Sequence, residues 1–93
     1  MTFNWSDEKN ALLKRTRGIS FEEIVIAIEG GHVVDVVQNT KRYPHQRVYL
    51  IAWRDYIYAV PFVRDLDNEE IFLKTIYPSR KYTKQYRFPE EER

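Results

Sequence analysis

A helix-start signal, followed by an abrupt change of hydrophobic period, constrains this chain most. Ser20 and Glu23 have the spacing of a capping box, in which each side chain accepts a hydrogen bond from a free backbone N–H at the helix start. Apolar residues then recur at helical spacing until Gly30-Gly31, which ends the pattern. From residue 32 the chain reads HVVDVVQ, a β-branched run that is typical of a strand. The fold must therefore combine a helix with a sheet that follows it.

Similar signals predict the remaining elements. Ser6, followed by two acidic residues, is suited to begin an earlier helix that ends near Gly18. Arg54-Asp55 separates two strand-like runs by two residues, which is the length of a tight hairpin connection. The elements predicted beyond residue 31 are strands at 32–38, 47–53, 56–63 and 71–77 and a short helix at 80–87.

Two prolines punctuate this second half. Pro61 lacks a backbone donor, so we expect an edge or a bulge at that point of its strand. Pro78 is expected to break the last strand, and Ser79 is placed to cap the basic helix that follows.

These elements predict an α+β fold with two N-terminal helices, a four-stranded antiparallel β-meander and a short C-terminal helix. The alternating residues 3–5 leave open whether a short N-terminal strand is added. We expect the helices to cover one face of the sheet and to leave the other face free for contacts. A chain of 93 residues supports one core, so we expect a single domain over residues 1–93 with a flexible tail at 89–93.

Composition excludes several classes of protein. The chain has no cysteine, which rules out disulfides and thiolate zinc sites. Its two histidines lack partners at metal-ligand spacing, so we expect no metal and no cofactor. The first residues do not read as a signal peptide, and no apolar run approaches the ~20 residues of a membrane helix. These observations favour a cytoplasmic protein without a membrane partner.

The charge is unevenly distributed. The net charge of the whole chain is only +1, yet the stretch IFLKTIYPSRKYTKQYRF at residues 71–88 contains five Lys or Arg residues and no Asp or Glu. The other residues therefore carry a net charge of −4. Such asymmetry indicates a local anionic partner that the average charge does not reveal.

Four stretches also occur in the order seen in a known family. They are F-x-W-x-x-x-K-N from Phe3 to Asn10, RGISFEE at 17–23, YPHQRVYLIAW at 43–53 and IFLKTIYPSRKYTKQY at 71–86. Together they resemble the BrnT-type toxins of bacterial type II toxin–antitoxin systems. The resemblance implies a fold like that of the RelE superfamily, RNA cleavage that arrests translation, and neutralisation by a partner antitoxin, with a ribbon-helix-helix protein as one option.

Within this resemblance, the C-terminal motif departs from that of the best-known members. Lys74 and Tyr77 stand where that motif has serine and lysine, and Arg80 matches a basic position. The basic and aromatic character is retained, while the individual side chains differ. A toxin-like module that binds RNA or an antitoxin without cleaving RNA is therefore the alternative function.

The candidate catalytic residues follow from the chemistry of metal-independent RNA cleavage. The 2′-OH must be activated, charge on the phosphorus centre must be stabilised, and the leaving oxygen needs a proton. Arg80 is the candidate phosphate clamp, and Lys74 is a candidate electrostatic stabiliser or proton donor. Tyr77 offers a hydrogen bond or a stacking surface, and His45 is the candidate acid or base. Each has a structural alternative, such as a solvated surface charge or a packing aromatic ring.

A second group of residues is expected to bind RNA without taking part in the chemistry. A basic helix attracts phosphates through its cations and can stack bases on its aromatic rings. The alternative is an ordinary solvated helix face. The predicted RNA-binding residues are Lys81, Tyr82, Lys84 and Arg87.

Overall fold

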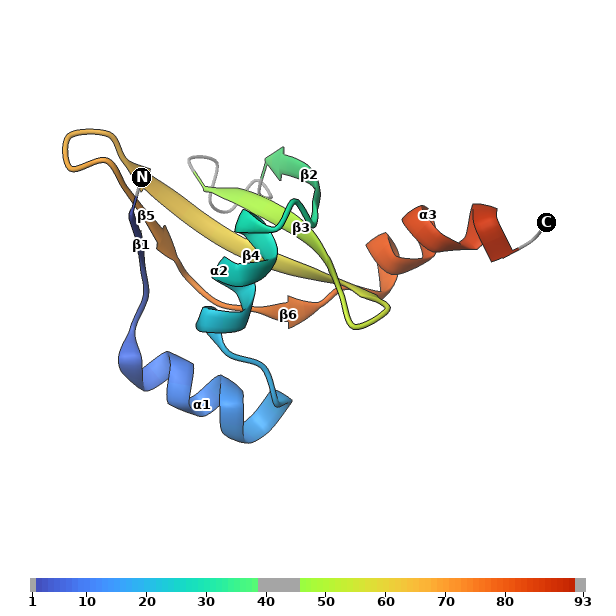
Figure 1. The fold of residues 1–93 in the computed structure, drawn as a ribbon, viewed down its shortest axis with the longest axis horizontal. Coiled ribbons are helices and arrows are strands. Elements are labelled where there is room, and N and C mark those ends of the chain that lie inside the picture. The colour runs from blue at the N-terminus through green and yellow to red at the C-terminus, as the bar shows by residue number, and fades with distance from the viewer. Residues whose placement is uncertain (1, 39–45, 92–93) are drawn as a thin grey trace.

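The structure, a computed structural model, describes residues 2–38 and 46–91, with the side chains of the last helix described as far as Tyr86. This part of the chain forms three helices and six strands (Figure 1). Their order is β1 (Thr2–Asn4), α1 (Asp7–Arg17), α2 (Phe21–Glu29), β2 (Val33–Gln38), β3 (Arg47–Trp53), β4 (Tyr56–Asp65), β5 (Glu70–Leu73), β6 (Tyr77–Pro78) and α3 (Arg80–Glu91).

The predicted α+β class is confirmed, and the sheet is more complex than a meander. Strands β2 to β5 are antiparallel neighbours in sequence order, as expected, and the full order is β1-β5-β4-β3-β2. β1 adds a parallel pairing to β5, because the chain leaves β1 through two helices and returns only after three strands. The sheet is therefore mixed. No helix among the described residues is long and apolar enough to cross a membrane.

The strand predicted at 71–77 is divided in two. β5 ends at Leu73, and Tyr77–Pro78 forms the separate strand β6, which pairs with β4. Between them Ile76 turns fully into the core at 0% exposure, and its carbonyl accepts a hydrogen bond from Arg17 of α1. The strand does end at Pro78-Ser79, as predicted, but it is not continuous over residues 71–77, because a further interruption comes earlier, between Leu73 and Tyr77.

Pro61 explains part of this interruption. We expected an edge or a bulge here. β4 is flanked on both sides and its pairing with β3 has no register shift at Pro61, so neither is observed; instead, the other side of β4 changes partner from β6 to β5 around this residue. The Pro61 carbonyl accepts from the Lys74 N–H at 2.8 Å, on the side that faces the gap between β5 and β6. The backbone N and C=O of a strand residue point to the same side of the strand. The N–H that proline lacks would therefore point into the gap between β5 and β6, where no strand of the described chain pairs with β4.

The predicted helix starts are present. Ser20 Oγ accepts from Glu23 N at 3.1 Å, and the Glu23 carboxylate accepts from Ser20 N at 2.9 Å, which completes the capping box. Ser6 Oγ accepts from Lys9 N at 3.1 Å, and Gly18 ends α1 at a φ of 66°. The predicted helix at 80–87 is also present and continues to Glu91.

The Arg54-Asp55 hairpin is confirmed and has a second role. Both residues have positive φ, 55° and 62°, as a type I′ hairpin turn requires. The Arg54 guanidinium then donates to the Gly18 carbonyl at 3.0 Å and pairs with Glu23. The hairpin is thereby tied to the start of α2.

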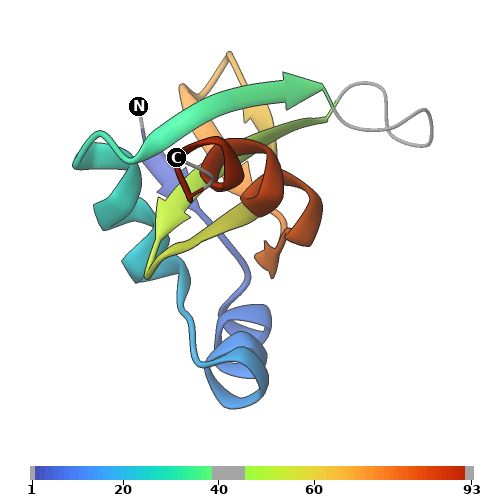
Figure 2. The ribbon, with the colours of Figure 1, turned by 90° about the vertical axis from the view of Figure 1, so that its right-hand side faces the viewer.

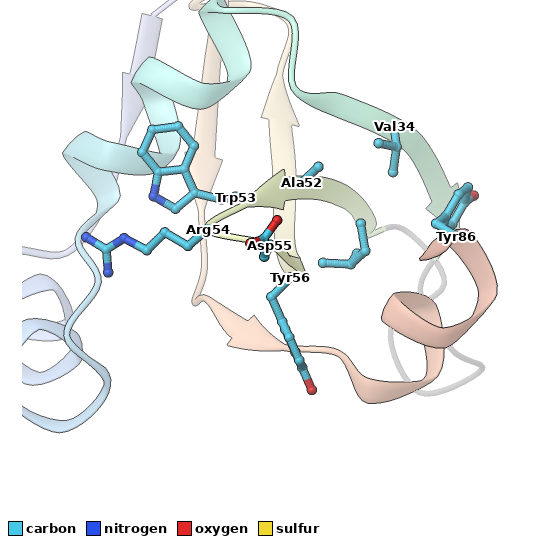
Figure 3. A pocket seen from close by; sticks show the side chains of 8 residues that line it. Val34, Ala52, Trp53, Arg54, Asp55, Tyr56 and Tyr86 are labelled. Atoms are coloured by element: carbon cyan, nitrogen blue, oxygen red, sulfur yellow. The ribbon is translucent and has the colours of Figure 1, made fainter. Parts of the chain in front are cut away.

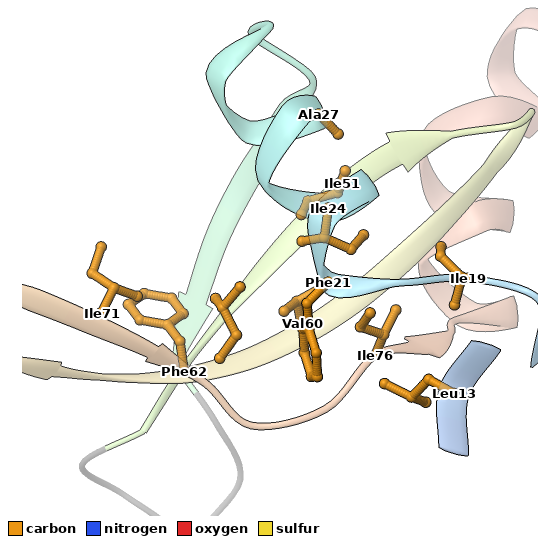
Figure 4. Close-up of a cluster of buried hydrophobic side chains, with 11 residues drawn as sticks. Leu13, Ile19, Phe21, Ile24, Ala27, Ile51, Val60, Phe62, Ile71 and Ile76 are labelled. Atoms are coloured by element: carbon orange, nitrogen blue, oxygen red, sulfur yellow. The ribbon is translucent and has the colours of Figure 1, made fainter. Parts of the chain in front are cut away.

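The two faces of the sheet are covered by different helices. We call them the α2 face, with Ile51, Val60 and Phe62, and the α3 face, with Leu50 and Ala59. Helices α1 and α2 pack on the α2 face, where the larger cluster of buried side chains lies (Figure 4). Helix α3 lies on the opposite face (Figure 2), so the prediction of one free face is wrong. The reason is that the basic helix also carries aromatic rings that pack on the sheet.

Candidate functional site

The predicted residues Lys74 and Tyr77 lie on the α3 face. Tyr77 is opposite Ala59 in the β4–β6 pairing, and cross-strand partners share a face. The Lys74 ammonium lies 5.4 Å from the centre of the Phe72 ring, and both side chains are exposed. The Tyr77 side chain is also exposed. A cation and two aromatic rings therefore line the outer part of this face.

The start of α3 is anchored to β4 by the Ser79 backbone and the Thr83 hydroxyl. Ser79 is buried, donates its N–H to the Ile57 carbonyl at 2.8 Å, and caps the helix by accepting from Tyr82 N at 3.2 Å. Thr83 Oγ1 accepts from the Ile57 N–H at 2.9 Å. We call these contacts the Ser79–Thr83 clasp. Arg80, the first residue of the helix, directly follows this anchor and is exposed.

The other predicted RNA-binding residues are arranged unevenly. Tyr82 is half-buried against the small cluster of the α3 face, so its ring contributes to packing. The Lys81 ammonium lies 5.2 Å from the Tyr82 ring centre, and Lys84 is exposed on the same helix. Arg87 continues the helix, but its side chain is outside the described part. His45 also lies outside the described residues.

Three of the four predicted catalytic residues are therefore exposed in sequence along one short segment beside β4. We call Lys74, Tyr77 and Arg80 the strand–helix junction. An arginine and a lysine can stabilise a negatively charged phosphate, and a tyrosine can donate a hydrogen bond to it. Within the described ranges no three His, Asp or Glu side chains gather as a metal site would require.

A second charged surface was missed by the sequence interpretation. A hollow of about 400 Å³ opens on the α2 face, beyond the helices, and we call it the arginine-rimmed hollow. It is lined by Val36, Arg47, Tyr49, Phe62, Arg64 and Ile71. The sequence did contain a signal for it in Arg47-Val48-Tyr49 and Phe62-Val63-Arg64. Residues two apart on a strand share a face, so each stretch places an arginine and an aromatic ring on the same face.

The floor of this hollow is aromatic and its rim is cationic. The rings of Tyr49 and Phe62 are stacked with centroids 4.1 Å apart and an interplanar angle of 18°. Burial raises the pKa of the Tyr49 phenol, while the nearby charge of Arg64 acts in the opposite direction. Arg64 and Tyr49 line the same hollow.

A second hollow, of about 340 Å³, lies beside the β3–β4 hairpin (Figure 3). Tyr86 reaches into it from α3, and Val34 contributes from β2. The Tyr86 hydroxyl donates to Asp35 at 3.0 Å, and burial followed by this hydrogen bond raises the pKa of the phenol. Trp53 Nε1 is buried and has no hydrogen-bond partner in the described chain. This hollow contains none of the predicted catalytic residues.

Comparison with known proteins adds no relative from which a function can be transferred. The assignment of function therefore depends on the chemistry of the strand–helix junction and on the resemblance of the four sequence stretches. No family model matches the chain, and no curated protein or solved structure is significantly similar to it.

Proposed function

We propose that this protein is a toxin of a type II toxin–antitoxin system with a RelE-like fold, acting in the cytoplasm as a metal-independent endoribonuclease. The observation that carries the proposal is the strand–helix junction, where Lys74, Tyr77 and Arg80 are exposed along one segment. The Ser79–Thr83 clasp holds that segment in place. Pre-positioned cations of this kind stabilise charge that develops during phosphoryl transfer.

The chemistry assigns a different task to each side chain. The ribose 2′-oxygen attacks the adjacent phosphorus, the bond to the 5′-oxygen breaks, and the products are a 2′,3′-cyclic phosphate and a 5′-hydroxyl. Arg80 binds the nonbridging phosphate oxygens through its planar donors, and Lys74 adds a point charge or donates the proton to the leaving oxygen. Tyr77 donates a hydrogen bond to the phosphate or stacks on a neighbouring base.

The resemblance to BrnT-type toxins provides the biological context. A chain of this family is neutralised by an antitoxin encoded beside it, so the partners we propose are RNA and such an antitoxin. His45 stays a candidate for the acid or base, and Lys81, Tyr82, Lys84 and Arg87 stay candidates for phosphate and base contacts.

The test is cleavage of a labelled RNA by purified protein in the presence of EDTA. We expect products with 5′-hydroxyl ends, and no cleavage when every ribose carries a 2′-O-methyl group. Arg80→Ala should reduce the cleavage rate at least a hundredfold if its clamp supplies ~3 kcal/mol to the transition state. Arg15→Ala, which removes an exposed cation of α1, is the matched control and should retain activity.

Lys74→Ala separates a chemical role from simple attraction. Retained RNA binding with lost cleavage would assign Lys74 to the chemistry, whereas equal losses would assign it to binding. If the folded wild-type protein binds RNA but never cleaves it, the non-catalytic module is the correct description. Expression of the chain in cells, with and without its partner, adds growth arrest and new RNA ends as independent readouts.

A further inference from the structure

The arginine-rimmed hollow has cations that the described chain does not neutralise. Neither Arg47 nor Arg64 is in an ion pair or hydrogen bond with another side chain of residues 2–38 or 46–86. Asp65, the carboxylate next in sequence to Arg64, is instead bound to Asn68, whose Nδ2 donates to it at 2.8 Å. Hydrogen bonds from Asn68 lower the pKa of Asp65, so that carboxylate is committed to the β4–β5 turn. The two guanidiniums are thus available to external anions.

The floor between the two guanidiniums is apolar. Val36 is 40% exposed on β2, and Ile71 closes the opposite side from β5. Leu66, at 70% exposure, lies in the adjoining concavity that Arg47 and Arg64 also line. Arginine and tyrosine are enriched in protein-binding hot spots, and the exposed aliphatic side chains beside them add apolar area that a partner can bury.

The same floor is poorly suited to nucleic acid. Single-stranded RNA gains its affinity from bases stacked on exposed aromatic rings. Here Phe62 is only 4% exposed, and its ring is stacked against Tyr49. A second copy of this chain is also disfavoured, because a two-fold contact through this surface would bring the arginines of both copies together.

We propose that the arginine-rimmed hollow docks an acidic, amphipathic segment of the partner protein, with carboxylates on Arg47 and Arg64 and an apolar side chain over Val36 and Tyr49. The inference depends on the proposed function only for the identity of that partner, the antitoxin encoded beside this chain. Arginine binds carboxylates in a bidentate geometry, so the two cations would also set the orientation of the bound segment.

The location makes this surface separable from the strand–helix junction. The hollow is on the α2 face, whereas Lys74 and Tyr77 are on the α3 face. Substitutions at the hollow should therefore weaken the partner complex without removing a group that contacts the scissile phosphate. The acidic segment would anchor the partner on the α2 face, and this contact does not depend on which other surfaces the partner covers.

The experiment measures binding of the purified product of the adjacent gene by titration calorimetry. Arg47→Gln/Arg64→Gln should weaken the complex about ten- to a hundredfold, since two charge-assisted contacts are lost. Val36→Ser should weaken it severalfold without a change of charge. Lys14→Gln/Arg15→Gln, which removes two exposed cations from α1, is the matched control and should have an effect below about threefold. Circular dichroism and the urea midpoint of every variant confirm that it is folded.

The outcomes distinguish this inference from the proposed function. Cleavage of RNA by the hollow variants, with growth arrest that the partner no longer relieves, is the expected result. The inference is overturned if Arg47→Gln/Arg64→Gln binds the partner as tightly as the wild type does. It is also overturned if both double variants lose affinity equally, or if the wild type does not bind the partner. None of these results bears on RNA cleavage, which the cleavage assay tests separately. A loss of RNA affinity rather than partner affinity would also overturn the inference and would assign the hollow to RNA.

Discussion

The two faces of the sheet are stabilised in different ways. On the α2 face, Phe21, Ile24 and Ala27 are fully buried in one cluster, and Asn10 joins the two helices above it. On the α3 face, Tyr82 and Tyr86 are only half-buried on a smaller cluster, and polar contacts fix the helix start. Burial of apolar area contributes more to folding than any other favourable interaction. The α2 face therefore supplies most of the stability of the fold. Substitutions in α3, or local unfolding of α3, should cost less free energy than the same changes in α2.

The largest effect expected from this comparison is at the centre of α2. Ile24 is 0% exposed, so Ile24→Ala should lower the free energy of unfolding by about 2–5 kcal/mol through lost burial and a residual cavity. Ile26 lies two residues further along the same helix at 62% exposure and provides the matched control. Ile26→Ala should change stability by less than about 0.5 kcal/mol in urea titrations. Similar losses at both positions would contradict the assignment of the main core to this face.

Asn10 is the next most sensitive position. Its side chain accepts from the buried Phe21 N–H at 2.8 Å and donates to Glu22 at 2.8 Å, so Asn10→Ala leaves a buried donor without a partner. We expect a loss of about 2–3 kcal/mol in unfolding free energy. Thr16→Ala on the same helix, whose exposed hydroxyl bonds only to Leu12, should cost less than about 1 kcal/mol. A small effect at Asn10 would mean that the two helices are joined by apolar packing alone.

The same side chain should also change the response to acid. The hydrogen bond from Asn10 is the main cause that lowers the pKa of Glu22, with a smaller contribution from Lys14. A carboxyl whose folded pKa is depressed adds stability above its unfolded pKa, and this stability is lost as the pH falls through the folded pKa. Urea midpoints between neutral and acid pH should therefore fall less in Asn10→Ala than in the wild type. An unchanged slope would show that Glu22 owes its shift to other groups.

Tyr82 tests how firmly α3 is attached. Because its ring is half-buried, Tyr82→Ala should cost about 1–2 kcal/mol, less than the substitution at Ile24. Hydrogen exchange should accelerate in α3 well before it does in α2, since opening of α3 would be local. Equal acceleration in both helices would show that α3 unfolds together with the main core, and the contrast between the faces would fail.

A smaller effect is expected at the end of the described part of α3. Tyr86→Phe removes only the hydrogen bond to Asp35 and should cost about 0.5–1 kcal/mol. Burial, and then that hydrogen bond, raises the pKa of the Tyr86 phenol. A raised folded pKa means that the stabilisation is present below the unfolded pKa and is lost as the pH rises through the folded one. The wild type should therefore lose more stability than Tyr86→Phe in alkaline buffer, and parallel curves would exclude ionisation of the Tyr86 phenol as the cause.

The smallest change in stability is expected at the strand–helix junction. Lys74 and Arg80 are exposed, and their side chains make no hydrogen bond or ion pair within the described chain. Replacing either by alanine should shift the free energy of unfolding by less than about 0.5 kcal/mol. Cleavage assays on the same proteins would then report on chemistry rather than folding. A marked loss of stability would mean that these cations support the fold instead.

Local signals predicted the helices well because their causes lie within a few residues. The capping box at Ser20 and the two-residue turn at Arg54-Asp55 act through neighbouring backbone groups, and the structure contains both. The division of the last strand could not be predicted in this way. It depends on Ile76 turning into a core formed by distant segments and on Arg17, 59 residues earlier, binding its carbonyl.

The candidate site shows the same limit. The sequence predicted a basic, aromatic segment, and the residues of the junction lie in it, but Tyr82 could not be distinguished from its neighbours as a packing residue. The arginine-rimmed hollow was missed because its two arginines come from separate strands. Only the β3–β4 register, with Arg47 opposite Phe62, brings them to one surface.

The sequence by itself determined the α+β class, the helix starts and the antiparallel order of β2 to β5, since each follows from short-range hydrogen bonding, turn geometry and hydrophobic period. The tertiary structure decided the parallel pairing of β1 with β5, the attachment of α3 to the second face and the convergence of Arg47 and Arg64 on one hollow. These features depend on which apolar surfaces meet once the chain has collapsed. That choice is made by contacts between residues far apart in sequence, which no local pattern encodes.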